Sequence, residues 1–271
     1  MQPVLLFRAD HENQAELEAA RRLWSVEEDR MRCQNQLVVG RYSVLPFYDA
    51  LEQDLAERRC RLINTHTQHR WIADFDYYPT FQDVTPESWS EEEFSSAPEG
   101  LFVLKGRCNS FKHRWTELMF ANDKADAFRK AAMLHEQQLI SQQGLVFRRF
   151  VPLETYEHTS SGLPITNEWR FFFVGDLLVG YGYYWNTMAR IATPSMDNAG
   201  IEFAYSCASR VAGKAAFFAV DIARTVSGLW SLIELNDGQS SGLGAIDPDE
   251  FYRELKSACG QVVSAGFSST R

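Results

Sequence analysis

Three oxygen-bearing side chains in the carboxyl-terminal part of the chain, Asp221, Glu234 and Asn236, have types and spacing suited to a hard divalent cation. They lie in the segment FFAVDIARTVSGLWSLIELNDG, which has the pattern of two strands around a turn. With Ser227-Gly228 as a two-residue turn, residue 226 pairs with 229, and Asp221 then lies directly opposite Glu234. Because side chains alternate between the two faces of a strand, Asn236 shares the face of the two acids.

The other face of this predicted hairpin is expected to enter a core, and it carries Val220, Ile222, Ile233 and Leu235. Directly opposed like charges, roughly 5 Å apart at Cβ, destabilise a sheet, so the two acids need a positive partner. Mg²⁺ prefers oxygen ligands and is the natural candidate. The alternative is a solvated hairpin edge with unrelated acids, and a three-residue turn would shift the pairing.

Lys105 ends an apolar segment, LFVLK, and precedes Gly106 and the polar loop RCNSFKHR. A lysine in this position can reach the phosphates of a nucleotide while the loop closes over them. The alternative is a lysine whose stem lies along the surface at a strand end. The chain contains no GxxxxGK[ST] pattern, so a P-loop is excluded as the phosphate-binding device.

A strand predicted at residues 145–151, LVFRRFV, places Arg148 and Arg149 among apolar residues and is stopped by Pro152. The edge of such a strand presents backbone N–H and carbonyl groups that can recognise an adenine ring. Glu154 follows closely enough to contact a ribose. These positions indicate a pocket for a nucleoside beside the end of the strand.

Arg170 lies within NEWRFFFVG, on the same predicted strand face as Glu168 and Phe172. A buried arginine needs an anionic partner, which a phosphate or a carboxylate would provide. The alternative to a phosphate is a structural ion pair with Glu168 or Glu154.

Composition limits the classes of function. The 271 residues carry a formal net charge of −9, which argues against general affinity for nucleic acids or anionic membranes. The five cysteines are odd in number and widely scattered, as is typical of reduced thiols in a cytoplasmic protein. The first residues lack the pattern of a signal peptide, and no apolar run approaches the ~20 residues that cross a bilayer. We therefore expect a soluble cytoplasmic protein with no nucleic-acid or membrane partner.

The first hundred residues alternate between predicted strands and helices. Strands are expected at residues 4–7, 36–43 and 60–63, with a polar helix over 12–31 and a second helix over 47–59 that Pro46 opens. This alternation predicts a small α/β layer. In the stretch Thr65–Gly100, His66 and His69 are expected on a surface loop, and SWSEEEFSSAPEG is expected to form an exposed connector.

The remaining residues predict a β-rich half. Asp123 can cap a helix that Gly144 ends, and Gly175-Asp176 can join two aromatic strands at 168–174 and 177–185. A last helix is expected from Asp247-Pro248 onward.

Taken in order, LFVLKGR, GLVFRRFVPLE, NEWRFFFVGDLLVGYGYYW, VDIA and LIELNDGQSSGL resemble the ATP-grasp superfamily over roughly Leu101–Tyr252. The resemblance is nearest to short bacterial and phage ATP-grasp proteins and to the eukaryotic cell-division-cycle assembly factors of that fold. It implies an α+β fold in which two β-rich subdomains clasp ATP after a small α/β layer. The expected units are residues 1–97, 98–152 and 153–271, the middle one being the lid.

The resemblance also implies roles for single residues. Lys105 would be the nucleotide-binding lysine of the lid and would take part in catalysis with Arg170, which would contact the ATP phosphates or an acyl phosphate. The adenine hinge, the ribose contact and an assisting arginine would be Phe150 and Val151, Glu154, and Arg149. The Mg²⁺ ligands would be Asp221, Glu234 and Asn236.

The activity implied is ATP- and Mg²⁺-dependent ligation of a carboxylate to an amine through an acyl phosphate. The substrate would be a small molecule, an amino acid, a peptide or a protein tail. One alternative is an assembly or chaperone-like protein that binds ATP and closes on a protein partner without ligating. Another is a phosphotransferase that stops at a phosphorylated product.

Overall fold

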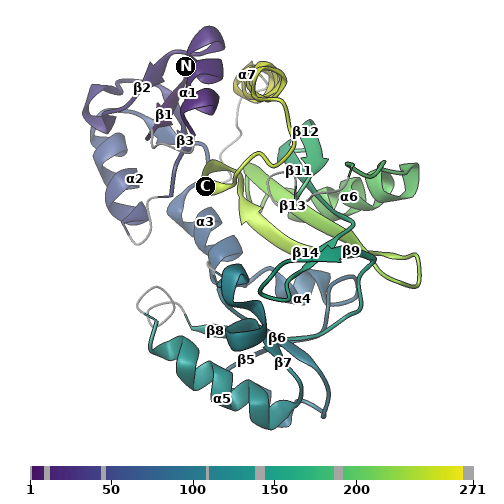
Figure 1. Ribbon diagram of the computed structural model, residues 1–271. Helices are drawn as coiled ribbons and strands as arrows, with labels where there is room; N and C mark the ends of the chain where they lie inside the picture. The colour runs from purple at the N-terminus through teal and green to yellow at the C-terminus, as the bar shows by residue number, and fades with distance from the viewer. Residues whose placement is uncertain are drawn as a thin grey trace.

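The computed structural model describes residues 2–8, 13–43, 47–107, 110–137, 144–185 and 192–264. An amino-terminal layer, a carboxyl-terminal sheet with helices and a smaller sheet with one helix follow one another from the top to the bottom of Figure 1. The expected positions of Pro46, of Cys108 and of the last turn before Gly144 lie outside the described residues.

The amino-terminal layer is a parallel sheet in the order β2-β1-β3-β4. Its two longer strands are buried on both faces, as is usual in parallel sheets covered by helices. Val4, Leu6 and Val38 pack with helix α2, and Leu5 and Phe7 enter the core that is shared with helices α1 and α7. The bounds are β1 Pro3–Phe7, α1 Gln14–Leu23, β2 Val26–Glu27, β3 Leu37–Arg41, α2 Tyr48–Glu57 and β4 Arg61–Leu62.

The segment that follows β4 is not the exposed loop and connector expected from its polar sequence. It forms helix α3 (His66–Ala73), helix α4 (Tyr78–Phe81) and strand β5 (Ser88–Ser90). Phe81 and Phe94 are fully buried in two different cores. Their large apolar side chains outweigh the acidic residues around them, so this segment joins the three parts of the molecule.

The smaller sheet, called the lid sheet below, has the antiparallel order β5-β8-β6-β7. Its strand β5 comes from before the expected boundary at residue 97. Helix α5 covers it, and Asp123 caps this helix by accepting from the N–H of Asp126 at 2.7 Å, as predicted. The other bounds are β6 Phe102–Gly106, β7 Phe120–Ala121, α5 Lys124–His135 and β8 Leu145–Arg149.

The large sheet is antiparallel in the order β12-β11-β13-β14. Alternate residues of β11 enter different cores: Phe172 faces helix α7, and Phe171 and Phe173 face helix α6. Figure 1 shows these helices on the two sides of the sheet. The bounds are β11 Glu168–Val174, β12 Leu177–Tyr183, α6 Asn198–Val211, β13 Phe217–Arg224, β14 Trp230–Asp237 and α7 Pro248–Ser264.

A two-stranded sheet of β9 (Thr155–His158) and β10 (Pro164–Thr166) lies between the two larger sheets in the chain. The short helical turns are η1 Arg30–Arg32, η2 Phe94–Ser96, η3 Lys112–Arg114, η4 Trp115–Met119 and η5 Gly238–Ser240. Among the described residues, no helix is both long and apolar enough to span a membrane.

Candidate functional site

Arg170 and Asp221 face each other on the neighbouring strands β11 and β13. The guanidinium donates from Nε and Nη2 to the two carboxylate oxygens, each at 2.7 Å, and Asp221 is only 1% exposed. Asn236 on β14 donates from Nδ2 to the same carboxylate at 3.0 Å. Burial lowers the pKa of Arg170, but the Asp221 carboxylate outweighs this effect and raises it. The partner of Arg170 is thus neither Glu168 nor Glu154.

A second ion pair joins the lid sheet to the large sheet. Lys105 on β6 contacts the Glu234 carboxylate on β14 through its ammonium group. The side chains are 11% and 22% exposed, so the pair lies in a partly dry cleft. The charge compensation expected from a metal ion is therefore provided in this structure by Arg170 for Asp221 and by Lys105 for Glu234.

The β13–β14 hairpin confirms the predicted pairing of Asp221 with Glu234, but for a different reason. The turn is longer than two residues, since Thr225 pairs with Leu229 through its N–H. A β-bulge at Ile233 then restores the register by one residue. Consequently Leu232 takes the core position predicted for Ile233, and Ile233 lines a cavity.

A cavity of about 430 Å³ lies between the lid sheet and the large sheet. Both partners of the second ion pair, Lys105 and Glu234, line it. Apolar side chains line much of the rest, namely Val103, Met119, Phe150, Val151, Leu163 and Ile233. An apolar slot with a cation at its border has the chemistry to hold a flat heteroaromatic ring and an attached anionic group.

Arg149 and Glu154 are placed less directly. Arg149 lines the cavity, yet its guanidinium donates to the carbonyls of Glu99 at 3.1 Å and Pro98 at 3.2 Å. Glu154 lies between two residues that line the cavity, and its own carboxylate accepts from Tyr156 at 3.2 Å and Asn167 at 3.3 Å.

Lys112 and Glu168 also line this cavity, and neither was singled out as a site residue from the sequence. Lys112 donates to the Tyr184 hydroxyl at 2.7 Å and lies 4.2 Å from the centre of that ring. Burial lowers the pKa of Lys112, but Tyr184, Glu168 and Asp221 together raise it. Burial raises the pKa of Glu168, against the opposing effect of Lys112. Strand alternation with Arg170 was the available signal for Glu168, whereas nothing in the local sequence marked Lys112.

A second, smaller cavity of about 180 Å³ lies beside Arg170 and Asn236. His69, Arg107 and Asp237 also contribute to its lining. Arg170 and Asn236 both bond to Asp221, whose strand partner Glu234 lines the larger cavity. The predicted metal-binding side chains therefore lie where the two cavities approach each other.

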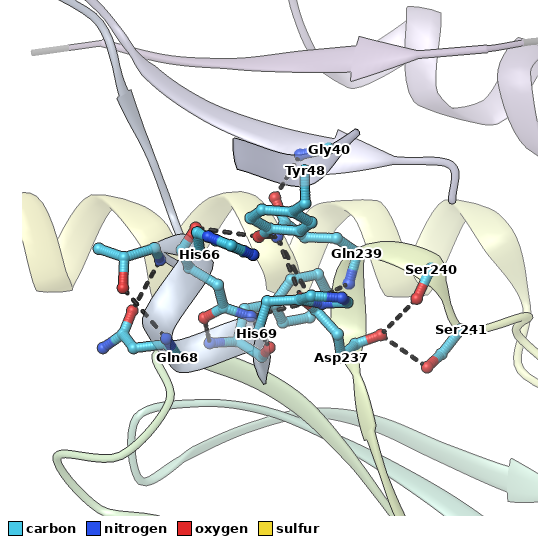
Figure 2. Close-up of polar contacts among 12 residues, drawn as sticks. Gly40, Tyr48, His66, Gln68, His69, Asp237, Gln239, Ser240 and Ser241 are labelled. Atoms are coloured by element: carbon cyan, nitrogen blue, oxygen red, sulfur yellow. Dashed lines mark hydrogen bonds and ion pairs between the residues drawn. The ribbon is translucent and has the colours of Figure 1, made fainter. Parts of the chain in front are cut away.

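His69 is not on a surface loop as expected. It lies in helix α3, is 5% exposed, and belongs to a polar cluster with Tyr48, Asp237 and Gln239 (Figure 2). A capping box between Thr65 and Gln68 starts the helix directly after β4, and this position turns His69 inward. Two histidines three residues apart carried no sequence signal of burial.

The described residues contain no ready-made group of three or more acidic, histidine or cysteine ligands. Asp221, Glu234 and Asn236 nevertheless offer two carboxylates and an amide oxygen, which are ligand types that Mg²⁺ accepts. The donor chemistry fits the ion, provided that Arg170 and Lys105 exchange their partners.

The two β-rich units, the cleft between them and the preceding parallel layer define an ATP-grasp fold, and the chain belongs to the ATP-grasp family. Residues 50–255 match the family model of an ATP-grasp domain, the third family of its clade. No curated protein matches the sequence significantly.

Solved structures of the same fold match nearly the whole chain. An ATP-grasp RimK domain protein from Sphaerobacter thermophilus aligns with a TM-score of 0.58 at 14% identity, covering 95% of this chain and 99% of its own. D-alanine–D-alanine ligase from Bacillus anthracis, complexed with ATP, gives 0.57 at 12%, covering 97% of both chains. The ATP-grasp ligase PsnB, complexed with minimal precursor, Mg and ADP, gives 0.54 at 12%, covering 95% and 98%.

Proposed function

We propose that this chain is an ATP- and Mg²⁺-dependent ligase that joins a carboxylate to an amine through an acyl phosphate. The observation that supports it most is the pair of cavities that meet at two cation–carboxylate pairs, Lys105–Glu234 and Arg170–Asp221. Two structures of this fold are a D-alanine–D-alanine ligase with ATP and the ligase PsnB with a precursor, Mg and ADP.

In this proposal the larger cavity takes the nucleotide. The adenine ring lies in the apolar part beside Phe150 and Val151, with Arg149 nearby, and the phosphates extend toward Lys105. Glu154, between two residues of the cavity lining, is the proposed ribose contact. Closure of the lid sheet would exclude water and strengthen the charge interactions within the cleft.

Asp221, Glu234 and Asn236 are the proposed Mg²⁺ ligands, and the bound ion would neutralise charge on the phosphates. Lys105 and Arg170 would then exchange a carboxylate partner for phosphate oxygens. This exchange keeps each buried charge compensated, which matters because an unpaired buried charge costs several kcal/mol.

The chemistry needs positioning more than a nucleophilic side chain. An oxygen of the substrate carboxylate attacks the γ-phosphorus, the bond to the bridging oxygen breaks, and ADP leaves. Arg170 stabilises the negative charge of the acyl phosphate. An amine then attacks the acyl carbon, and the C–O bond to phosphate breaks. The proposed substrate is a small molecule, an amino acid, a peptide or a protein tail.

The test is ADP release measured with Mg-ATP and a panel of carboxylates and amines, supplied singly and together. We expect release that depends on Mg²⁺, on one carboxylate and on one amine. Tight binding of ATP without turnover across the panel would favour an assembly protein, and release with a carboxylate alone that yields a stable phosphorylated product would favour a phosphotransferase.

A further inference from the structure

His69 carries an acceptor or donor atom that the folded chain leaves unused. Its ring stacks on Tyr48, with centroids 4.2 Å apart and planes 12° from parallel. Its Nδ1 lies 2.9 Å from Asp237 Oδ2. Its Nε2 is buried without a hydrogen-bond partner within the part of the chain that the structure describes. Leaving such an atom unpaired costs about 1–3 kcal/mol, so the position points to a ligand.

The network around Asp237 fixes the ring and its tautomer. Asp237 Oδ1 accepts from Asn64 Nδ2 at 2.9 Å and from the N–H of Gln239 at 2.9 Å. The remaining carboxylate oxygen faces His69 Nδ1, and a carboxylate is satisfied by a donor. Nδ1 therefore carries the proton, and Nε2 presents a lone pair. Figure 2 shows this arrangement between helix α3 and the end of strand β14.

The amino-terminal layer holds this network from the other side. Gln239 Oε1 accepts from the N–H of Gly40 at 3.0 Å, and Arg41 Nη2 donates to the Ser241 carbonyl at 3.0 Å. The loop after β14 is thereby fixed beside the smaller cavity. Its lining is a preorganised wall and not a mobile surface.

The smaller cavity combines this histidine with two guanidinium groups. His69, Arg107 and Arg170 all line it, together with Asn236 of the proposed metal site. Its volume of about 180 Å³ corresponds to roughly six water molecules at ~30 Å³ each, which suits one small end group. The guanidinium groups match an acyl phosphate, and the histidine lone pair matches a protonated nucleophile.

We propose that the smaller cavity is the subsite for the amine acceptor and that His69 is the catalytic base of the second half-reaction. The proposal rests on the proposed ligase function. The amine nitrogen bonds to the acyl carbon, one N–H proton moves to His69 Nε2, and the C–O bond breaks with its electron pair on the departing phosphate. Asp237 stabilises the resulting imidazolium.

The first test separates the two half-reactions in His69→Gln, with His66→Gln as the control. His66 lies on the same helix and is not in the lining of the cavity. Mg-ATP and a mixture of the twenty L-amino acids are supplied with and without hydroxylamine, which is unprotonated at neutral pH and traps an acyl phosphate without a base. General bases contribute about 10²- to 10⁴-fold. We expect ADP release without hydroxylamine to fall at least about 100-fold in His69→Gln and hydroxamate formation to stay within about twofold.

Equal loss of both reactions in a folded His69→Gln protein, or retention of both, would overturn the role of His69 as a base. If the wild type releases no ADP under either condition, the proposed function fails for amino-acid substrates, and the failure is not specific to His69. A second measurement does not need turnover. ¹⁵N NMR of the full chain should show His69 with a protonated Nδ1 and a bare Nε2 at neutral pH, and a protonated Nε2 with a bare Nδ1 would overturn the proposal.

Discussion

Arg170 and Asp221 form a cross-strand pair in which both carboxylate oxygens accept a hydrogen bond from one guanidinium at 2.7 Å. The two residues lie on the central strands of the large sheet, and each is at least nine-tenths buried. A carboxylate proposed as a metal ligand is thus already held in place by an arginine proposed as a phosphate ligand. The pair orients the site and also contributes to the stability of the fold.

Removal of Arg170 leaves the Asp221 carboxylate buried without its cation. We expect Arg170→Ala to lower the free energy of unfolding by about 3–5 kcal/mol, the usual cost of breaking a buried ion pair. Urea denaturation measures this change. Arg22→Ala removes an exposed partner of Asp249 and serves as the control, with no measurable change expected. A loss below about 1 kcal/mol in Arg170→Ala would show that the pair is not buried as described.

Lys105 connects the lid sheet to Glu234 and is the proposed phosphate ligand. We expect Lys105→Ala to weaken Mg-ATP binding about 10- to 100-fold, since hydrogen bonds to charged groups contribute about 1.5–3 kcal/mol. Isothermal calorimetry measures the affinity. The exposed Lys214 lies outside both cavities, and its alanine variant should bind as the wild type does. Identical affinities for all three proteins would remove Lys105 from the nucleotide site.

The fold can be predicted further from the sequence than its details can. Strand alternation correctly placed Asp221 opposite Glu234 and on the face of Asn236. The core residue of that hairpin was wrong because a longer turn and a bulge at Ile233 compensate for each other. Local turn propensity does not encode such a bulge, which depends on packing against other elements.

Long-range contacts account for the other differences. Phe94 lies in an acidic, proline-flanked stretch, yet it stacks on Phe147 of the lid sheet. His69 is buried because β14 brings Asp237 to it across 168 residues of sequence. Lys112 enters the cavity because it contacts Tyr184. Each of these placements is decided by a partner that is remote in the sequence.

Three thiols should make stability fall at alkaline pH. Burial raises the pKa of Cys259 to about 12, that of Cys207 to about 12 and that of Cys33 to about 11. Unfolded thiols titrate near ~8.5, so above that pH the unfolded chain releases protons that the folded chain keeps. The free energy of unfolding should therefore fall as the pH rises from about 8.5 toward the folded pKa values.

Urea denaturation between pH 8 and pH 10.5 measures this loss, and Cys259→Ala should make it less steep. Iodoacetamide at pH 9 should alkylate Cys259 slowly in the folded protein and rapidly in urea. Rapid alkylation of Cys259 in the folded protein would contradict a buried thiol.

The exchange of partners at the two ion pairs is most directly tested by ATP affinity in Glu234→Gln, with Mg²⁺ and with EDTA. Without the ion, phosphates that engage Lys105 leave the Glu234 carboxylate uncompensated in the wild type, and the glutamine removes this repulsion. With the ion, the glutamine removes a ligand. Calorimetry should thus show weaker Mg-ATP binding and tighter ATP binding in EDTA for Glu234→Gln than for the wild type. Affinities that are unchanged, or that move in the same direction under both conditions, would contradict a Mg-ATP site at Asp221, Glu234 and Asn236.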